Sequence, residues 1–590
     1  MAARLKEKLP GPFRNFFKRL FHTKSVDELE GDSDNKTMKK SLTAFDITLL
    51  GIGAIIGAGI FVLTGQAAGK NAGPAIVISF LIAGIAAGLA ALCYAEMASM
   101  LPIAGSAYTY SYATMGELLA WTIGWDLILE YLVGSATVSV SWSSYVVAFL
   151  DDVGAGSIVH REWATAPFAF NDTTNTFSTT GAYINAPAVV IVLLITVLLV
   201  VGIKESARLN ALAVFIKVTV VLIVIFGSIK WIDPSNWHPF VPPPGDSFGR
   251  FGVGGIFQAT TMCFFAYIGF DAVSTTAQEC KNPQRDLPIG ILASLLISTV
   301  LYMAVCLCLT GLIPYELMEN VAHPLAKAAE HVGQYWLAIV SEVGAVFGLL
   351  SVMIVMLMGQ PRVFYSMSQD GLLPPCFARL HPRFGTPVFP TILTGVLCAT
   401  LGGLLPISVL GELTSVGTLL AFLLVSLGVM ILRITRPDLP RKFRVPFGPY
   451  VIPLLSAACS LTLICVSTVQ TIIRLFVWMA IGYIIYFAYG IRNSKLRKKR
   501  REAARSMAGD NMEMKQTTSP PPGPPPYDEV GEERPHRVVP TDGPHHEAKS
   551  AWTTGAHITT IAVGDIDPKV NSSRHNDISG RRNSTLLRTE

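Results

Sequence analysis

Long apolar runs alternate with short polar segments over most of the chain. Two examples are PAIVISFLIAGIAAGLAALCY, which begins at Pro74, and PAVVIVLLITVLLVVGI, which begins at Pro187. About 20 apolar residues are needed to cross the ~30 Å hydrocarbon core of a bilayer. The pattern therefore predicts about twelve membrane-spanning helices. They lie near residues 45–69, 74–99, 118–149, 185–203, 209–230, 256–278, 288–312, 336–361, 388–406, 413–433, 450–470 and 472–491.

The composition agrees with a polytopic membrane protein. Of the 590 residues, 51% are hydrophobic and 15% are charged, whereas about one quarter of the residues in a soluble domain are charged. The nine cysteines lie mostly in apolar segments and no pair has zinc-ligand spacing. We therefore expect no disulfide framework, no metal site and no cofactor.

The polar residues divide the chain into three regions. Residues 1–41 form a basic arm that lacks the continuous apolar core of a signal peptide. Residues 42–492 hold the spans, and residues 493–590 form a proline-rich tail that we expect to be disordered. The loops on the side of the N-terminus carry about twice as many Lys and Arg residues as the loops opposite. This asymmetry predicts that both termini are cytosolic.

Two short motifs lie in these polar segments. Pro524, Pro525 and Tyr527 belong to the sequence PPPY, which fits the P-P-x-Y pattern that WW domains bind in polyproline II geometry. The partner would be a WW-containing ubiquitin ligase, at the plasma membrane or an endolysosomal membrane. The alternative is a proline tract that nothing recognises. Asn171 begins an N-D-T glycosylation signal in the long loop predicted to lie outside the cytosol.

Two spans contain segments that are poor at forming helix. In the first span, GIGAIIGAGIF (residues 51–61) has four glycines, and in the sixth, FFAYIGFDAVSTTAQE (residues 264–279) combines Gly269 with a polar run. Irregular backbone inside a membrane is tolerated only around a cavity or within protein. Breaks five spans apart indicate an inverted five-helix repeat with a substrate site between the halves. The alternative is that the glycines serve only close helix packing.

Charged side chains within the spans support a substrate site. Glu130 lies about 18 Å into the third span and Lys217 about 12 Å into the fifth, at 1.5 Å per residue. Asp271 follows the second break. Ionisable groups at such depth are usually functional or paired. A buried lysine can release its proton readily, so Lys217 is a candidate for coupling to a proton gradient. Glu96, near the inner end of the second span, is expected to reach water.

Five segments together resemble the amino acid–polyamine–organocation (APC) superfamily, and most closely its cationic amino acid transporter family and the bacterial proton-coupled homologues. They are GIGAIIGAGIFVLTG, YAEMASMLPIAGSAYTYSY, GWDLILEY, FFAYIGFDAVSTTAQECKNPQRDLPIGI and GQPRVFYSMSQDGLLP. The resemblance implies an all-α, LeuT-type fold. Its inverted repeats of five helices would cover about 45–230 and 256–433, with two additional helices at 450–491. It implies alternating access around an L-amino acid.

The same resemblance implies a set of substrate contacts. The carboxylate would meet the backbone of residues 57–60, the ammonium group would meet carbonyls of Ile55, Phe265 and Ile268, and Phe265 would gate the site. The eighth helix would complete the side-chain pocket near Ser351 or Met353. The substrate-binding residues expected in this way are Ile55, Gly57, Ala58, Gly59, Ile60, Glu130, Phe265, Ala266, Ile268, Asp271, Ser351 and Met353, with Lys217 as the coupling residue.

Several functions remain open at this stage. Cationic substrates such as arginine and lysine are favoured, but small neutral amino acids and an amino acid-sensing transceptor are alternatives. A channel would need a continuous polar stripe or filter. An enzyme would need clustered catalytic side chains inside the spans, and no histidine lies in any of them. The outer loop lacks the cysteine that links light-chain exchangers to a heavy chain, so no such partner is expected, and no nucleic acid either.

Overall fold

The computed structural model describes residues 23–24, 42–101, 105–171, 176–245, 249–319, 321, 323–467, 469–503 and 505–506. Most of the predicted basic arm and of the tail, with Pro524, Pro525 and Tyr527, lies outside the described residues. The described part is largely helical. One antiparallel hairpin, β1 (Phe168–Asn171) with β2 (Thr176–Thr179), lies in the long loop that carries Asn171. The apolar pattern did not predict this hairpin.

The helices extend over the following residues: α4 (Ala44–Ile55), α5 (Thr64–Ala67), α6 (Ile76–Met100), α7 (Ser106–Thr114), α8 (Glu117–Ile128), α9 (Gly134–Asp152), α10 (Ala186–Val201), α11 (Ile203–Ser228), α12 (Gly252–Phe264), α13 (Pro283–Leu312), α14 (Pro324–His331), α15 (Tyr335–Gln369), α16 (Val388–Leu404), α17 (Ile407–Thr435), α18 (Val451–Val466), α19 (Val469–Ile485) and α20 (Ile491–Asn493). Short π-helical turns at Gly59–Leu63, Ala68–Ala72, Leu129–Val133 and Tyr486–Gly490 join several of them.

These helices form a polytopic membrane bundle. Among the described residues, eight helical segments are long and apolar enough to cross a membrane, and four apolar helices of 10–17 residues accompany them. Gly73, with φ of 58°, turns the chain between residues 59–72 and α6. Joining α4 to residues 59–72 and counting α6 separately gives about twelve crossing segments in the described chain, as the apolar pattern predicts.

One predicted boundary differs clearly from the structure. The eighth span was expected to end at residue 361, but α15 continues through Pro361 to Gln369. Proline removes a backbone donor and usually ends or kinks a helix. Here Arg362 pairs with Glu279, Nη2 to Oε1 at 2.5 Å, with both side chains buried. This tertiary contact holds the turn that follows the proline.

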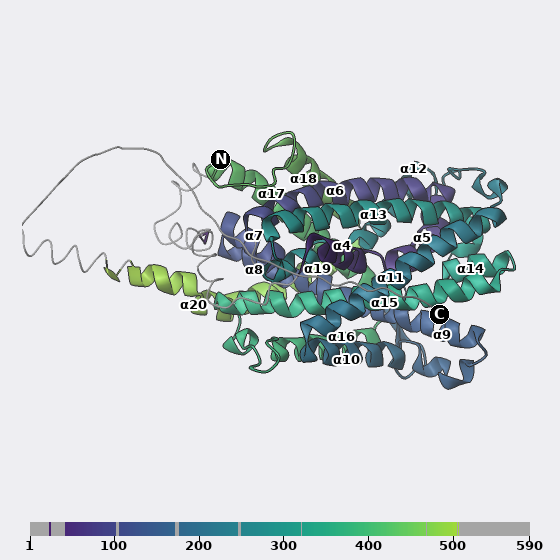
Figure 1. Ribbon diagram of the computed structural model, residues 1–590, viewed down its shortest axis with the longest axis horizontal. Helices are drawn as coiled ribbons and strands as arrows, with labels where there is room; N and C mark the ends of the chain where they lie inside the picture. Colours follow the sequence, from purple (N-terminus) through teal and green to yellow (C-terminus); the bar gives the residue numbers. More distant parts are fainter. Residues whose placement is uncertain are drawn as a thin grey trace, which may run out of the picture. The chain divides into compact units, whose positions relative to one another are not determined.

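The helices pack in two main groups. α6 packs against α12 and α13, and α13 also contacts α4. On the other side α15 packs against α9 and α11, and α10 packs against α16 (Figure 1). The two ends of the described domain meet, because Arg500 Nη2 donates to the carbonyl of Thr23 at 2.9 Å. We call the end of the bundle with Thr23 and Arg500 the terminal face, and the end with Lys70 and Ser467 the distal face.

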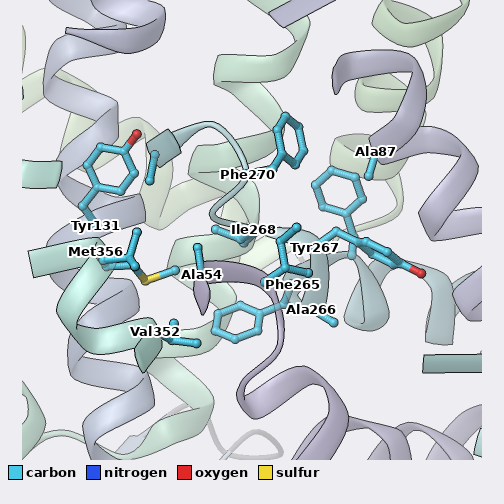
Figure 2. Packing of buried hydrophobic residues seen from close by; sticks show 14 of the residues in the cluster. Ala54, Ala87, Tyr131, Phe265, Ala266, Tyr267, Ile268, Phe270, Val352 and Met356 are labelled. Atoms are coloured by element: carbon cyan, nitrogen blue, oxygen red, sulfur yellow. The ribbon is translucent and has the colours of Figure 1, made fainter. Parts of the chain in front are cut away.

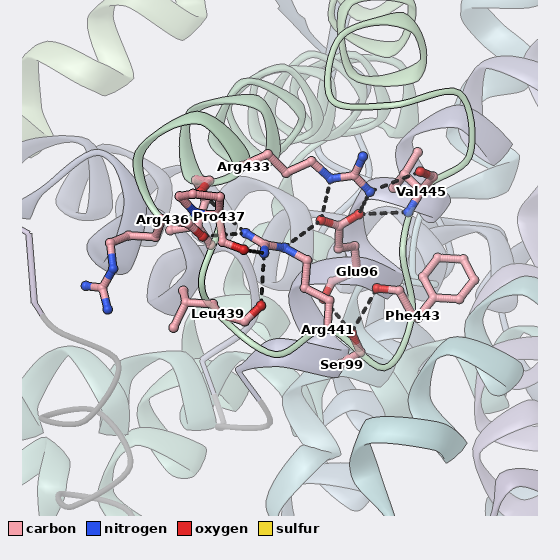
Figure 3. A network of polar contacts seen from close by, with 10 residues as sticks. Glu96, Ser99, Arg433, Arg436, Pro437, Leu439, Arg441, Phe443 and Val445 are labelled. Carbon is pink, nitrogen blue, oxygen red and sulfur yellow. Dashed lines mark hydrogen bonds and ion pairs between the residues drawn. The ribbon is translucent and has the colours of Figure 1, made fainter.

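Glu96 does not reach water as expected. Its side chain is fully buried and accepts hydrogen bonds from the Arg433 guanidinium, with Nε 2.8 Å from Oε1, and from the Val445 N–H at 2.8 Å. Arg441 Nε lies 3.4 Å from Oε1 (Figure 3). Arg433 lies in the last turn of α17, and the segment after α17 folds back over the end of α6 and carries Arg441 and Val445. A buried carboxylate is tolerated here because two guanidinium groups surround it.

Candidate functional site

The first span breaks at residues 56–58, within the glycine-rich stretch where the sequence predicts a break, although Gly51 and Gly53 lie inside α4. α4 ends at Ile55, Ile56 is extended with ψ of 103°, and the π-helical turn begins at Gly59. The Ile60 N–H bonds the Gly57 carbonyl at 3.1 Å. The first N–H groups of a helix have no intrahelical partner and lie at the positive end of its dipole. The backbone at residues 57–59 therefore offers donors to an anionic group.

The second break lies against the first. A short 3-10 turn, Phe265–Tyr267, ends at Ile268, and Gly269 follows with φ of 112°. A Cβ on Gly269 would lie 2.9 Å from the Ala54 Cβ, and a Cβ on Gly59 would lie 2.3 Å from the Ala266 Cβ. The glycines thus serve two purposes, because they let the helices break and they let the two breaks touch each other.

Lys217 binds the end of α4 directly. Its fully buried ammonium group donates to the carbonyls of Gly53 at 2.9 Å and Ile56 at 2.6 Å, and to the Ser351 hydroxyl at 2.7 Å. These carbonyls lie at the negative end of the α4 dipole, which favours a cation. All three ammonium donors are therefore engaged. Ser351 contacts Lys217 and the Gly53 carbonyl, at 3.0 Å, and links α15 to the first break.

Three acidic residues form a second cluster near the second break. Glu130 lies in the π-helical turn Leu129–Val133 and faces Asp271, Asp126 and Thr418. Asp271 accepts a hydrogen bond from the Tyr131 hydroxyl. The three carboxyl groups are at most 1% exposed, and no ion pair with them is found among the described residues. The structure thus brings Glu130 and Asp271 together, whereas the Lys217 ammonium group has Gly53, Ile56 and Ser351 as its partners.

A cavity of about 440 Å³ leads from the distal face to the breaks. Ala58 and Phe265 line its base, and Lys70 is the one charged side chain among its described lining residues. Its size falls in the range of small-molecule sites. Residues from several elements line it: Ala58, Val62, Leu63, Gln66, Lys70, Asn71, Thr137, Gln258, Thr261, Met262, Phe265, Ile407, Gly411, Ser415, Val416, Ser467 and Thr471.

The apolar surroundings of the breaks come partly from residues that sequence reasoning did not single out. A Cβ on Gly57 would lie 2.4 Å from Val352 Cγ2, and Met356 follows Val352 by one helical turn of α15. Figure 2 shows Val352 and Met356 among the apolar side chains gathered at the breaks, with Ala54, Phe265, Ala266 and Ile268. Met353, the expected pocket residue, is fully buried. Helical spacing alone could not decide which face of α15 points inward.

Tyr302 of α13 was also missed. Its hydroxyl oxygen lies 2.7 Å from the Ile55 carbonyl and 2.8 Å from the Ala266 carbonyl, so that one side chain touches both breaks. No pattern near residue 302 marked it, because a tyrosine inside an apolar span resembles any other aromatic residue of the core.

The terminal face is closed below the breaks. Arg362 pairs with Glu279, and Lys24 pairs with Asp370, Nζ to Oδ1 at 2.8 Å. Glu117 accepts hydrogen bonds from the Tyr486 hydroxyl at 2.8 Å and from Arg497 Nε at 2.9 Å. The described chain therefore has a cavity open to one face and a network of ion pairs across the other, which is the arrangement that alternating access requires.

Comparison with known proteins agrees with this geometry. Residues 42–489 match the family model described as amino acid permease. The chain is 47% identical over 480 residues to the branched-chain amino acid permease of Bacillus subtilis (strain 168), covering 81% of this chain and 99% of that protein. It is 44% identical over 479 residues to the methylthioribose transporter of the same organism, with the same coverage. It is 39% identical over 424 residues to the vacuolar cationic amino acid transporter 2 of Arabidopsis thaliana, covering 72% and 64%.

Proposed function

This chain belongs to the amino acid permease family of the APC superfamily, and we propose that it is a secondary active transporter that moves L-amino acids across a membrane by alternating access. The observation that carries the proposal is the pair of helix breaks in contact at the base of the cavity. The family consists of permeases and not of enzymes, and the chain is a multi-pass membrane protein.

The two breaks would bind the parts that all amino acids share. The carboxylate would accept hydrogen bonds from the backbone at residues 57–59, where the helix dipole is positive. The ammonium group would donate to carbonyls at the ends of the broken helices, such as those of Ile55 and Ile268. Phe265, at the base of the cavity, would close over the bound molecule. The backbone would then bind the carboxylate and ammonium groups of the substrate, and side chains of the protein would select the substrate's side chain.

Neutral amino acids with apolar side chains are the substrates that the geometry supports best. Val352 and Met356 face the breaks (Figure 2), and no acidic side chain lines the described part of the cavity. Lys70 would repel a cationic substrate on its way in. The branched-chain permease that is 47% identical to this chain has a name that agrees with this preference.

Cationic amino acids are the second candidate, which the sequence resemblance favours. The specific observation for them is Glu130, a buried carboxyl group beside Asp271 at the second break. A substrate ammonium or guanidinium group that reached Glu130 would gain a strong charge-assisted hydrogen bond. The vacuolar cationic transporter of Arabidopsis is a more distant relative, at 39% identity.

Transport would be coupled to protons through Lys217. The charged ammonium group joins the end of α4 to α15 through three hydrogen bonds. Loss of its proton would remove the charge and one donor, and would weaken the link between the first break and α15. The protonation state of Lys217 would then determine how easily α4 moves relative to α15.

The cavity would face the outside of the cell or the lumen of an organelle. The distribution of Lys and Arg predicts cytosolic termini, and the terminal face with Thr23 and Arg500 would then be the cytosolic face. The described conformation would be open to the outside. Glycosylation at Asn171 and binding of a WW-domain ligase to the tail remain predictions.

Uptake by purified protein in proteoliposomes tests this function. Labelled leucine would be offered with and without an inward proton gradient, and unlabelled arginine, alanine and methylthioribose would compete. We expect saturable leucine uptake that the gradient stimulates and that alanine inhibits more than arginine does. Saturable arginine uptake with little leucine uptake would establish the second candidate. Binding of amino acids without uptake would identify a sensor and contradict transport.

A further inference from the structure

We propose that the Tyr302 hydroxyl is a positioning group of the amino acid site, which holds the two helix breaks in register. This proposal rests on the proposed function, because it names a residue that shapes the substrate site from outside it. Tyr302 belongs to α13, which is not one of the broken helices. It therefore acts on both breaks from a third element of the bundle.

The contacts of the hydroxyl are specific to the breaks. Its oxygen lies 2.7 Å from the carbonyl of Ile55, the last residue of α4, and 2.8 Å from the carbonyl of Ala266 in the turn after α12. Inside a continuous helix both carbonyls would accept from an N–H four residues later. Each break frees its carbonyl, and the Tyr302 hydroxyl lies within hydrogen-bond distance of both, so that it can donate to one of them at a time.

The geometry leaves room for only small movements at this point. A Cβ on Gly59 would lie 3.1 Å from the Tyr302 hydroxyl oxygen and 2.7 Å from the Ala266 Cα. Gly59, Ala266 and Tyr302 are therefore in mutual contact. A displacement of either break relative to the other would stretch one of the two carbonyl contacts of the hydroxyl.

The ring of Tyr302 is itself held firmly. It packs against Phe80 of α6 with ring centroids 5.1 Å apart, and edge-on against Tyr267 at 5.3 Å with an interplanar angle of 90°. Tyr302 is fully buried. The hydroxyl is thus placed by packing, as a positioning group must be.

A proton count connects this contact to the substrate. The Tyr302 hydroxyl has one proton and can donate one hydrogen bond, but two carbonyl oxygens, those of Ile55 and Ala266, lie within reach of it. When the hydroxyl donates to one of the two carbonyls, the other carbonyl oxygen still lies less than 3 Å from the hydroxyl oxygen but accepts no hydrogen bond from it. An ammonium group that donated to either carbonyl would supply the missing proton. The ammonium group of an amino acid, by donating to the carbonyl that the Tyr302 proton does not reach, would complete the hydrogen bonding of these oxygen atoms.

Ser79 of α6 offers a control that lies outside both breaks, whereas Tyr267 belongs to the turn of the second break itself. Ser79 is also fully buried, and its hydroxyl donates to the Ile256 carbonyl of α12 at 2.9 Å. Ser79→Ala and Tyr302→Phe each remove one buried hydroxyl group that donates to a carbonyl of another element. Loss of a buried hydrogen bond lowers stability in both variants, but only Tyr302→Phe releases the breaks.

The test compares both variants with the wild type in proteoliposomes with labelled leucine. We expect Tyr302→Phe to raise KM about tenfold, the size of one hydrogen bond, with kcat changed less than threefold. Ser79→Ala is expected to change KM less than twofold, with a similar fall in Tm. Equal KM values for the two variants would overturn the proposal while leaving the transport function intact.

A second measurement does not depend on transport. Hydrogen–deuterium exchange of the ligand-free protein would follow peptides that cover residues 52–64 and 262–272. We expect Tyr302→Phe to speed exchange in both peptides at least threefold, and Ser79→Ala to speed exchange in neither. If wild type carried no amino acid, the proposed function would fail, yet this result would still decide whether Tyr302 holds the breaks. Faster exchange in only one peptide would contradict a shared contact.

Discussion

Lys24 Nζ lies 2.8 Å from Oδ1 of Asp370, although 346 positions separate the two residues. The other carboxyl oxygen of Asp370 accepts from the Tyr108 hydroxyl at 2.7 Å. The last described residue of the N-terminal arm is thereby joined to the end of α15 and to α7. This contact closes the terminal face together with the Arg362–Glu279 pair, and it holds Lys24 against the helical bundle.

The first prediction uses Cys280 to report opening of the terminal face. Burial raises the pKa of the Cys280 thiol to about 12, so the thiol is almost unreactive at pH 7 while the face is closed. Asp370→Asn removes the ion pair with Lys24 and should open the face more often. We expect alkylation of Cys280, followed by peptide mass spectrometry, to speed at least threefold. Cys376→Ser in both backgrounds removes a half-buried thiol that could also react, and an unchanged rate at Cys280 would contradict closure by Asp370.

The second prediction concerns stability at the end of α6. Glu96→Gln leaves the buried guanidinium groups of Arg433 and Arg441 without a charge partner (Figure 3). Breaking a buried pair in this way costs about 3–5 kcal/mol, so Tm in detergent should fall by several degrees. Asp438→Asn is the matched control, because its pair with Arg436 is exposed and such pairs contribute about 0–1 kcal/mol. Equal shifts in Tm would show that the buried network is not stabilising.

The third prediction follows from His323, in the loop before α14. Burial lowers its pKa, with Glu330 and Asp152 opposing the shift and Lys327 adding to it. A lowered pKa means that the native state binds fewer protons than the unfolded state, so stability should fall as pH drops through about 6.5. We expect His323→Phe, which keeps the edge-on ring contact with Tyr145, to flatten Tm between pH 7 and pH 5. His331→Phe, at an exposed position, should leave the slope unchanged.

The fourth prediction concerns charge selection in the cavity. Lys70 is its one charged residue among the described lining residues, and removal of a repulsion of about 1 kcal/mol would improve binding of a cation about fivefold. Arginine should therefore inhibit leucine uptake more strongly in Lys70→Gln, and its half-inhibitory concentration should fall by up to about fivefold. Lys230→Gln, an exposed lysine over Trp231, is the control. If the half-inhibitory concentration of arginine is the same in both variants, Lys70 does not select against cationic substrates.

The fifth prediction addresses proton coupling. Lys217→Met removes the ammonium group and its three hydrogen bonds to Gly53, Ile56 and Ser351. Leucine uptake should no longer respond to a proton gradient, although binding of leucine should persist. Ser351→Ala keeps the lysine and should keep the pH response. Unchanged pH-dependent uptake by Lys217→Met would rule out Lys217 as the coupling residue.

Much of the fold follows from local rules that a sequence displays. The twelve spans are visible because each needs about 20 apolar residues in succession. The breaks near Gly57 and Gly269 are visible because glycine and polar residues weaken a helix where a membrane demands one. The continuation of α15 past Pro361 was not visible, because a tertiary contact of Arg362 outweighs the local preference there. The hairpin of β1 and β2 was not visible because it is short and β2 is exposed, so that no apolar face marks it.

The sequence by itself determined the class of protein, the places where two helices break and the charged residues that lie near them. Only the tertiary structure decided what these groups touch: Lys217 binds the end of α4, Tyr302 bridges both breaks, Val352 and Met356 face them, and Lys24 reaches Asp370. The reason is physical. Helix breaking and membrane length depend on neighbours in the chain, whereas hydrogen bonds and packing join residues that lie up to 346 positions apart.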